Sequence, residues 1–313
     1  MPHDGHFRSS FVPHSMQNLA PAGFWAPQLE QVVTYELSQP RSCLLQVRLI
    51  TQEGGLTSAV VPDFLDLPAR PPKPRETGLT HVIDTGLSPH EAEGLMQTGA
   101  AYIDLVRLGF GSAYVTGALR EKIDLYRERG VPVALGGTLT ELAWLQKRVD
   151  GLRSWLKELG IEHVEVSSGS VPIPSADKAD LIRDLSADFT VFAEVGEKDP
   201  AAIIAPYRWV EMIEEALEAG ASKVVCEGRA SGDAGMYRPD GEARTGLIDE
   251  IVHRVDFHRL IFEAPKRHQQ VWFIEHMGPE VNLGNIRPDD VIPLETLRLG
   301  LRADTLHLFH SGE

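Results

Sequence analysis

Three short segments of the sequence place a glutamate at the end of an apolar run. They are AEVGEK, CEGRAS and FEAPKR, which contain Glu194, Glu227 and Glu263. A carboxylate that ends a buried strand is costly unless a cation or a hydrogen-bond donor lies beside it. With no cysteine or histidine pair nearby, these oxygens match the ligands that Mg²⁺ prefers, rather than those of Zn²⁺. The pattern predicts a hard-cation site, with a charge network to Arg and Lys side chains as the alternative.

Cationic and polar side chains recur at similar positions. Lys198 follows Glu194 by four residues, and a tight turn at Gly196 would direct it towards the strand ends, although a solvated loop lysine is the alternative. Arg229, with the nearby hydroxyl and flexible backbone of Ser231 and Gly232, suits an anionic group such as phosphate. A plain glycine-rich turn is the alternative there. The further polar candidates at strand ends are Asp84, Arg107, Thr138, Ser168, Asn282 and Asn285.

The elements that must position these residues follow one repeated pattern from Leu79 onward. A short apolar or β-branched run is followed by an amphipathic helical stretch. Ser88 and Glu91 form a capping box around Pro89, which predicts a helix start. The helical stretches end near glycines, where a left-handed cap is expected: Gly99, Gly130, Gly160, Gly220 and Gly278. The predicted strands are 79–84, 102–108, 131–135, 163–167, 189–195, 223–227, 260–263 and 281–286.

Alternation of strands and helices requires parallel strands with right-handed crossovers. Eight such units within about 230 residues match a (β/α)8 barrel in count and size. The competing open sheet usually carries a glycine-rich phosphate loop after its first strand, which the segment DTGLS does not supply. We therefore predict an α/β protein with a TIM-like barrel. In such a barrel the carboxyl ends of the strands carry the chemistry, and that is where the polar candidates lie.

The first part of the chain differs from the rest. Residues 1–62 are interrupted by proline and glycine and offer no convergent polar groups, so we interpret them as a partly ordered N-terminal extension. Residues 63–313 form the predicted catalytic barrel domain. A proline-rich segment, FLDLPARPPKPR, leads into it and favours extended backbone.

Composition narrows the class of partner. The 313 residues contain 30 Lys and Arg against 45 Asp and Glu, a net charge of −15, which disfavours nucleic acids and membrane surfaces. A small anionic substrate in a locally basic pocket remains compatible with this charge. No apolar stretch is long enough for a transmembrane helix, and two cysteines without a framework predict a reducing cytoplasm. The oligomeric state stays open, with a homo-oligomer among the alternatives.

From Phe64 to Asp304 the sequence resembles the phosphosulfolactate synthase family, whose members add sulfite to phosphoenolpyruvate. The resemblance rests on segments in family order, including AYIDLVRLGFGSA, GGTLTELAW, EVGEKD, CEGRASG, IFEAPKRHQQVWFI and VNLGNI. It implies a TIM-like barrel, Mg²⁺ dependence, phosphoenolpyruvate and sulfite as substrates, and Lys198 as the general acid. Two positions depart from the family pattern: Thr85 stands where a lysine is usual, and Arg107 replaces the lysine of strand two.

The expected activity is Mg²⁺-dependent addition of sulfite to C3 of phosphoenolpyruvate, giving (2R)-3-phosphosulfolactate, a carbon–sulfur lyase activity. The departures at Thr85 and Arg107 leave two alternatives open. One is a related barrel lyase that acts on another phosphorylated or enolisable acid. The other is a non-catalytic, stress-associated member of the family, against which the retained segments EVGEKD, EGRASG and FEAP argue.

Overall fold

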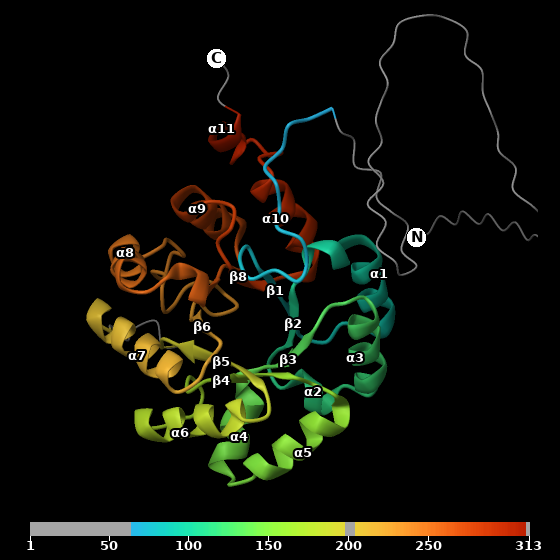
Figure 1. Cartoon of the computed structure of the whole chain (residues 1–313), viewed down its shortest axis with the longest axis vertical. Coiled ribbons are helices and arrows are strands. Elements are labelled where there is room, and N and C mark those ends of the chain that lie inside the picture. Colours follow the sequence, from blue (N-terminus) through green and yellow to red (C-terminus); the bar gives the residue numbers. More distant parts are fainter. Residues whose placement is uncertain (1–63, 198–203, 311–313) are drawn as a thin grey trace, which may run out of the picture. The chain divides into compact units, whose positions relative to one another are not determined.

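The computed structural model describes residues 64–197 and 204–310. Eight parallel strands form a closed barrel in the order β1 to β8, with helices around it (Figure 1). The strands are β1 (Thr80–Asp84), β2 (Leu105–Leu108), β3 (Val133–Leu135), β4 (His163–Val166), β5 (Thr190–Val195), β6 (Lys223–Cys226), β7 (Leu260–Glu263) and β8 (Leu283–Ile286). The predicted TIM-like barrel is confirmed.

Helices α1 to α9 lie between consecutive strands, as the sequence pattern predicts, and α10 and α11 follow the last strand. They are α1 (Pro89–Gly99), α2 (Ser112–Val115), α3 (Leu119–Glu128), α4 (Gly137–Leu145), α5 (Val149–Leu159), α6 (Ser175–Ser186), α7 (Pro206–Glu218), α8 (Thr245–Arg254), α9 (Arg267–Met277), α10 (Val291–Arg298) and α11 (Leu306–Phe309). The described residues also form three short 3₁₀ turns: η1 (Ala100–Tyr102), η2 (Phe257–Arg259) and η3 (Pro288–Asp290). No helix in the described part of the chain is long and apolar enough to cross a membrane.

The structure confirms most of the helix starts and ends that the sequence predicts. Ser88 and Glu91 make both bonds of the capping box, and Pro89 opens α1. Gly160 ends α5 with φ 68°, the left-handed conformation expected of it. Gly99 is an exception, because it keeps φ −123° and α1 runs directly into the turn η1. That turn also explains why β2 begins at Leu105 and not at residue 102 as predicted.

Buried faces of the helices cover the outer wall of the barrel. Tyr126 of α3 and Trp209 of α7 are almost fully buried in this outer core, together with Ile123 and Ile213 from the same helices. Burying an aliphatic or aromatic side chain of this kind contributes roughly 1.5–3 kcal/mol. This packing holds the strands rigidly, so that their carboxyl ends can present side chains in a fixed arrangement.

The proline-rich segment is anchored near the amino ends of the strands. Arg70 pairs with Glu295 of α10, with 2.9 Å between Nε and Oε1. Lys73 donates to the carbonyls of Ala100 and Ile103, next to the start of β2. These contacts tie the segment to the barrel. The predicted extension, residues 1–62, lies outside the described residues, and so does the proposed boundary at 62/63.

Candidate active site at the carboxyl ends of the strands

Side-chain alternation along the strands builds the site in two layers. Five buried apolar residues form a separate core within the barrel: Leu105, Ala134, Phe192, Val225 and Ile261. Side chains two positions apart on a strand point the same way. The positions that follow these core residues by two are therefore also directed inward, nearer the carboxyl ends, and four of them are Arg107, Glu194, Glu227 and Glu263. All four are buried.

Arg107 lies at the centre of this upper layer. Its Nη1 is 2.8 Å from Oε2 of Glu165 and 3.8 Å from Oε2 of Glu194. Its Nη2 is 3.4 Å from Oε1 of Glu263 and also donates to Oδ1 of Asn285. The guanidinium thus links β2 to four other strands. We call these five residues the mouth cluster.

The mouth cluster carries more negative than positive charge. Burial opposes the charge of Arg107, but the attraction of Glu165, Glu263 and Glu194 outweighs it and raises the pKa of the guanidinium above its usual range. Burial raises the pKa of the Glu263 carboxyl, against the pull of Arg107. The neighbouring Glu194 carboxylate adds to this rise, and the backbone N of Gly228 donates to Oε2 of Glu263 at 2.9 Å.

Glu165 was missed by the sequence analysis. It is buried, and besides Arg107 it accepts a hydrogen bond from the backbone N of Gly137 at 3.1 Å. The sequence candidate from this part of the chain is Ser168, after the fourth strand. The alternation in His163-Val-Glu165-Val could have found Glu165, because it is the penultimate residue of β4 as Glu194 is of β5.

Asp84 is placed differently from the expectation for a substrate-binding residue. Its carboxylate is fully buried, accepts a hydrogen bond from the Tyr126 hydroxyl at 2.9 Å and forms an ion pair with Lys122, whose Nζ lies 2.6 Å from Oδ2. It also accepts from the backbone N of Gly86 and Leu87, both at 2.8 Å. Burial and the charge of Asp84 raise the pKa of the Tyr126 hydroxyl. These contacts connect the loop after β1 to α3. Asp84 therefore stabilises the carboxyl end of β1, and its carboxylate is occupied by protein groups.

The two asparagines of the VNLGNI segment lie at opposite ends of β8. Asn285 adopts φ 54° and belongs to the mouth cluster through Arg107. Asn282 precedes β8, and its amide bonds the backbone of Leu79, His258 and Leu260 at 2.9–3.0 Å. Because these partners start β1 and β7, Asn282 joins strands at the other end of the barrel. The structure therefore places Asn282 away from the carboxyl ends of the strands, although the sequence analysis predicts it among the substrate-binding candidates there.

The residues expected after β3 and β4 lie on two neighbouring segments. Thr138 is half-buried in the first turn of α4, next to the Gly137 backbone that Glu165 holds. Ser168 lies in the loop after β4. The next part of that loop is fixed by Glu141 of α4, whose carboxylate accepts from the backbone N of Gly169, Ser170 and Val171 at 2.6–3.1 Å.

The loop after β6 contains the next three expected residues. Arg229 has φ 60°, and its backbone N donates to Oε1 of Glu227 at 2.5 Å. Its guanidinium is 3.9 Å from Asp233, which also accepts from the hydroxyl of Ser231. The carbonyl of Gly232 accepts from a side-chain amide of α9. Hydrogen bonds therefore fix the backbone of this loop near Arg229 and at Gly232. The Arg229 side chain is 42% exposed, so a ligand can reach it from solvent.

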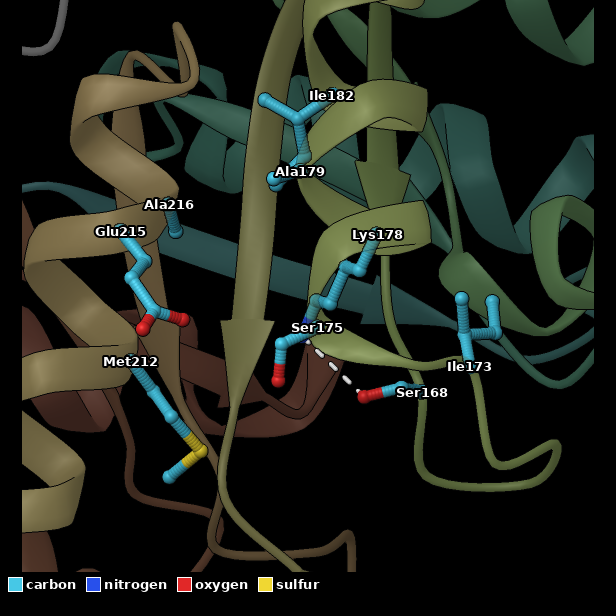
Figure 2. A pocket seen from close by; sticks show the side chains of 9 residues that line it. All are labelled: Ser168, Ile173, Ser175, Lys178, Ala179, Ile182, Met212, Glu215 and Ala216. Carbon is cyan, nitrogen blue, oxygen red and sulfur yellow. Dashed lines mark hydrogen bonds between the residues drawn. The ribbon is translucent and has the colours of Figure 1, made fainter.

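Lys198 lies outside the described residues. A different lysine, Lys178 of α6, reaches the end of β5 within the described part, where Nζ donates to the carbonyl of Glu194 at 2.5 Å and to Ser168 Oγ at 3.3 Å. Figure 2 shows Lys178 and Ser168 in a small pocket that α6 and α7 line, with Met212 and Glu215 on the α7 side. Its volume of about 60 Å³ is close to that of two water molecules at roughly 30 Å³ each. This pocket is too small for a metabolite.

A larger cavity opens at the mouth itself. It has a volume of about 480 Å³, within the range of roughly 300–1,000 Å³ of small-molecule sites. The residues that line it come from the ends of several strands and the loops after them: Ile83, Thr85, Leu87, Phe110, Ala230, Pro265, Asn285, Arg287, Pro288 and Asp289. Asn285 belongs both to this cavity and to the mouth cluster, which connects the two.

Among the described residues, no group of three or more His, Cys, Asp or Glu side chains is arranged to hold a metal ion. The expected trio of Glu194, Glu227 and Glu263 is buried at the mouth, but Glu194 and Glu263 face the guanidinium of Arg107. Mg²⁺ commonly binds through only one or two carboxylates, with waters and substrate oxygens completing its shell.

A closed parallel barrel with buried carboxylates, a central arginine and a cavity at the carboxyl ends of its strands defines a TIM-barrel enzyme. Sequence comparison narrows this class: residues 68–304 match the family of (2R)-phospho-3-sulfolactate synthase (ComA). The chain belongs to this family, which confirms the resemblance drawn from the sequence.

The chain aligns with nearly the whole length of two curated relatives. The chain is 42% identical over 250 residues to a phosphosulfolactate synthase of Bacillus subtilis, covering 79% of this chain and 99% of the relative. It is 40% identical to a phosphosulfolactate synthase of Methanothermobacter thermautotrophicus, covering 78% and 96%. Among solved structures, 3-hexulose-6-phosphate synthase from Salmonella typhimurium is similar with a TM-score of 0.45 and 15% identity, over 72% of this chain and 92% of that one.

Proposed function

We propose that this chain catalyses Mg²⁺-dependent addition of sulfite to C3 of phosphoenolpyruvate, giving (2R)-phospho-3-sulfolactate. The observation that carries this proposal is the mouth cluster beside the 480 Å³ cavity, in a chain of this family. Buried carboxylates at this density are costly for folding. Their presence supports a catalytic member of the family over a non-catalytic one.

The residues fit a hard cation in charge and donor type. Glu165, Glu194, Glu227 and Glu263 are all buried, and Arg107 supplies one positive charge among them. We propose that one or two of Glu194, Glu227 and Glu263 hold Mg²⁺, with substrate oxygens as further ligands. When bound, the ion supplies Lewis acidity at the substrate carboxylate.

The chain's own residues orient the substrate and move one proton. The lone pair on sulfite sulfur forms the C3–S bond, the C2–C3 π electrons shift towards C2 and the carboxylate, and a proton then adds to C2. We propose Lys198 as the donor of that proton, because the family resemblance implies a general-acid lysine there, four residues after Glu194 in the sequence. No group leaves, so the phosphate stays on C2. Arg229 is proposed to bind an anionic part of the substrates from the loop after β6.

The direct test is incubation of the purified protein with phosphoenolpyruvate, sulfite and Mg²⁺, followed by mass spectrometry. We expect a product whose mass equals the sum of phosphoenolpyruvate and bisulfite, formed only when both substrates are present. Consumption of phosphoenolpyruvate without sulfite would show that the chain catalyses another reaction of this substrate. No product under any condition would show that the chain acts on another enolisable acid or is not catalytic.

Metal dependence is tested in the same assay. EDTA should abolish turnover, and Mg²⁺ or Mn²⁺ should restore it, because oxygen ligands select hard cations. Zn²⁺ should not be required. Unchanged turnover after exhaustive chelation would assign the three glutamates to the charge network around Arg107 alone.

A further inference from the structure

The cavity at the mouth has an uneven distribution of charge. Of the described residues that line it, Arg287 is the cation and Asp289 the anion. Arg287 follows β8 directly, while the floor near Asn285 leads to the mouth cluster with its excess of carboxylates. A doubly charged anionic group is therefore attracted to the rim at Arg287 and repelled by the deeper carboxylates.

The present partner of Arg287 is local and exchangeable. Its Nε donates to Oδ1 of Asp289 and its Nη2 donates to Oδ2, each at 3.0 Å, and Asp289 lies two residues further along the chain. The side chains are 63% and 68% exposed. Exposed ion pairs of this kind contribute little to stability, so a ligand with more charge can replace Asp289. The paired geometry shows that the guanidinium already presents two parallel N–H donors, the arrangement that also binds a phosphate.

Arg107 is in the opposite situation. It is buried and already engaged by three carboxylates and by Asn285. Releasing it for a phosphate would remove the positive charge that faces three buried carboxylates, which costs far more than breaking the pair of Arg287 and Asp289. Arg107 therefore acts as a positioning residue for the acidic side chains.

We propose that Arg287 binds the phosphate of the substrate at the rim of the cavity, exchanging Asp289 for it. The ligand class is a small phosphorylated carboxylic acid, with its phosphate at Arg287 and its carbon skeleton extending past Asn285 towards the mouth cluster. The proposal rests on the proposed function for the identity of the substrate. The phosphate site itself depends only on the cavity and its charges.

The test is calorimetric titration with phosphoenolpyruvate and, separately, with pyruvate, which lacks the phosphate. Arg287→Gln should weaken phosphoenolpyruvate binding at least tenfold and leave pyruvate binding unchanged. Asp289→Asn should bind phosphoenolpyruvate as tightly as the wild type or more tightly, because it frees the guanidinium. Arg183→Gln is the matched control: Arg183 of α6 is similarly exposed and pairs with a nearby aspartate, Asp180.

Two further results separate this proposal from the proposed function. In steady state, Arg287→Gln should raise the KM for phosphoenolpyruvate with kcat within about threefold. Tenfold weaker binding in a protein that never forms phosphosulfolactate would support the phosphate site and reject the proposed activity. Unchanged binding by Arg287→Gln, no binding by the wild type, or loss only in Arg229→Gln would overturn the proposal for Arg287.

Discussion

At the scale of single residues, the site combines groups with separate tasks. Both terminal nitrogens of Arg107 face acidic side chains, so its charge stabilises the cluster and is not available to a substrate phosphate. Asp84 and Asn282 are held by other protein groups, and each connects strands, helices or loops. For the proton donor we keep Lys198, the residue that the family resemblance implies as the general acid.

Lys198→Ala should lower kcat by about 10²–10⁴, the usual contribution of a general acid, while the KM for phosphoenolpyruvate changes much less. An unperturbed lysine with a pKa of about 10.4 is protonated at neutral pH and can begin the cycle as an acid. Steady-state kinetics checks this, with Lys157→Ala on α5 as the control, since Lys157 is exposed and pairs with Asp188. Near-normal kcat in Lys198→Ala would show that the proton comes from another group.

At the scale of elements, the sequence predicted the barrel well because each strand and helix carries a local signal. Alternating apolar runs, the Ser88 capping box and helix-ending glycines all depend on near neighbours in the chain. The side-chain partners could not be predicted in this way. Whether Asn282 faces the mouth or joins β1 to β7, and whether Asp84 meets Lys122, depends on contacts between distant segments.

The loop after β4 shows how a helix shapes the mouth. Glu141→Gln should destabilise the protein by about 1–3 kcal/mol, because the amide replaces an oxygen that accepts backbone N–H groups and leaves part-buried donors unpaired. The shift of the urea unfolding midpoint measures this loss. Glu158→Gln on α5, where the side chain is 72% exposed, should change the midpoint very little. Equal midpoints for the two variants would mean that Glu141 does not hold the loop.

At the scale of the whole molecule, the barrel encloses polar groups below the mouth cluster. His81 of β1 is buried, and neither ring nitrogen has a hydrogen-bond partner among the described residues. Burial, helped by the charge of Arg107, lowers the pKa of His81 from 6.5 to about 3. The folded barrel therefore holds this imidazole neutral, whereas the unfolded chain protonates it below about pH 6.5.

The consequence is a loss of stability in acid. Between pH 6.5 and about 3 the unfolded state binds one more proton at His81 than the folded state, so stability falls as the pH falls, by up to about 1.4 kcal/mol per pH unit from this group. His81→Leu should flatten this part of the profile of unfolding free energy against pH. A slope identical to that of the wild type would show that His81 is protonated in the folded barrel.

The central claim is that the mouth cluster is the place of catalysis, and it is tested most directly by the sulfite-dependent turnover of Glu263→Gln. Its control is Glu275→Gln, a partly exposed residue of α9 that pairs with His307. We expect Glu263→Gln to lose about 100-fold or more in kcat/KM, with Glu275→Gln within twofold of the wild type and both variants folded. Wild-type kcat/KM in folded Glu263→Gln would contradict the account.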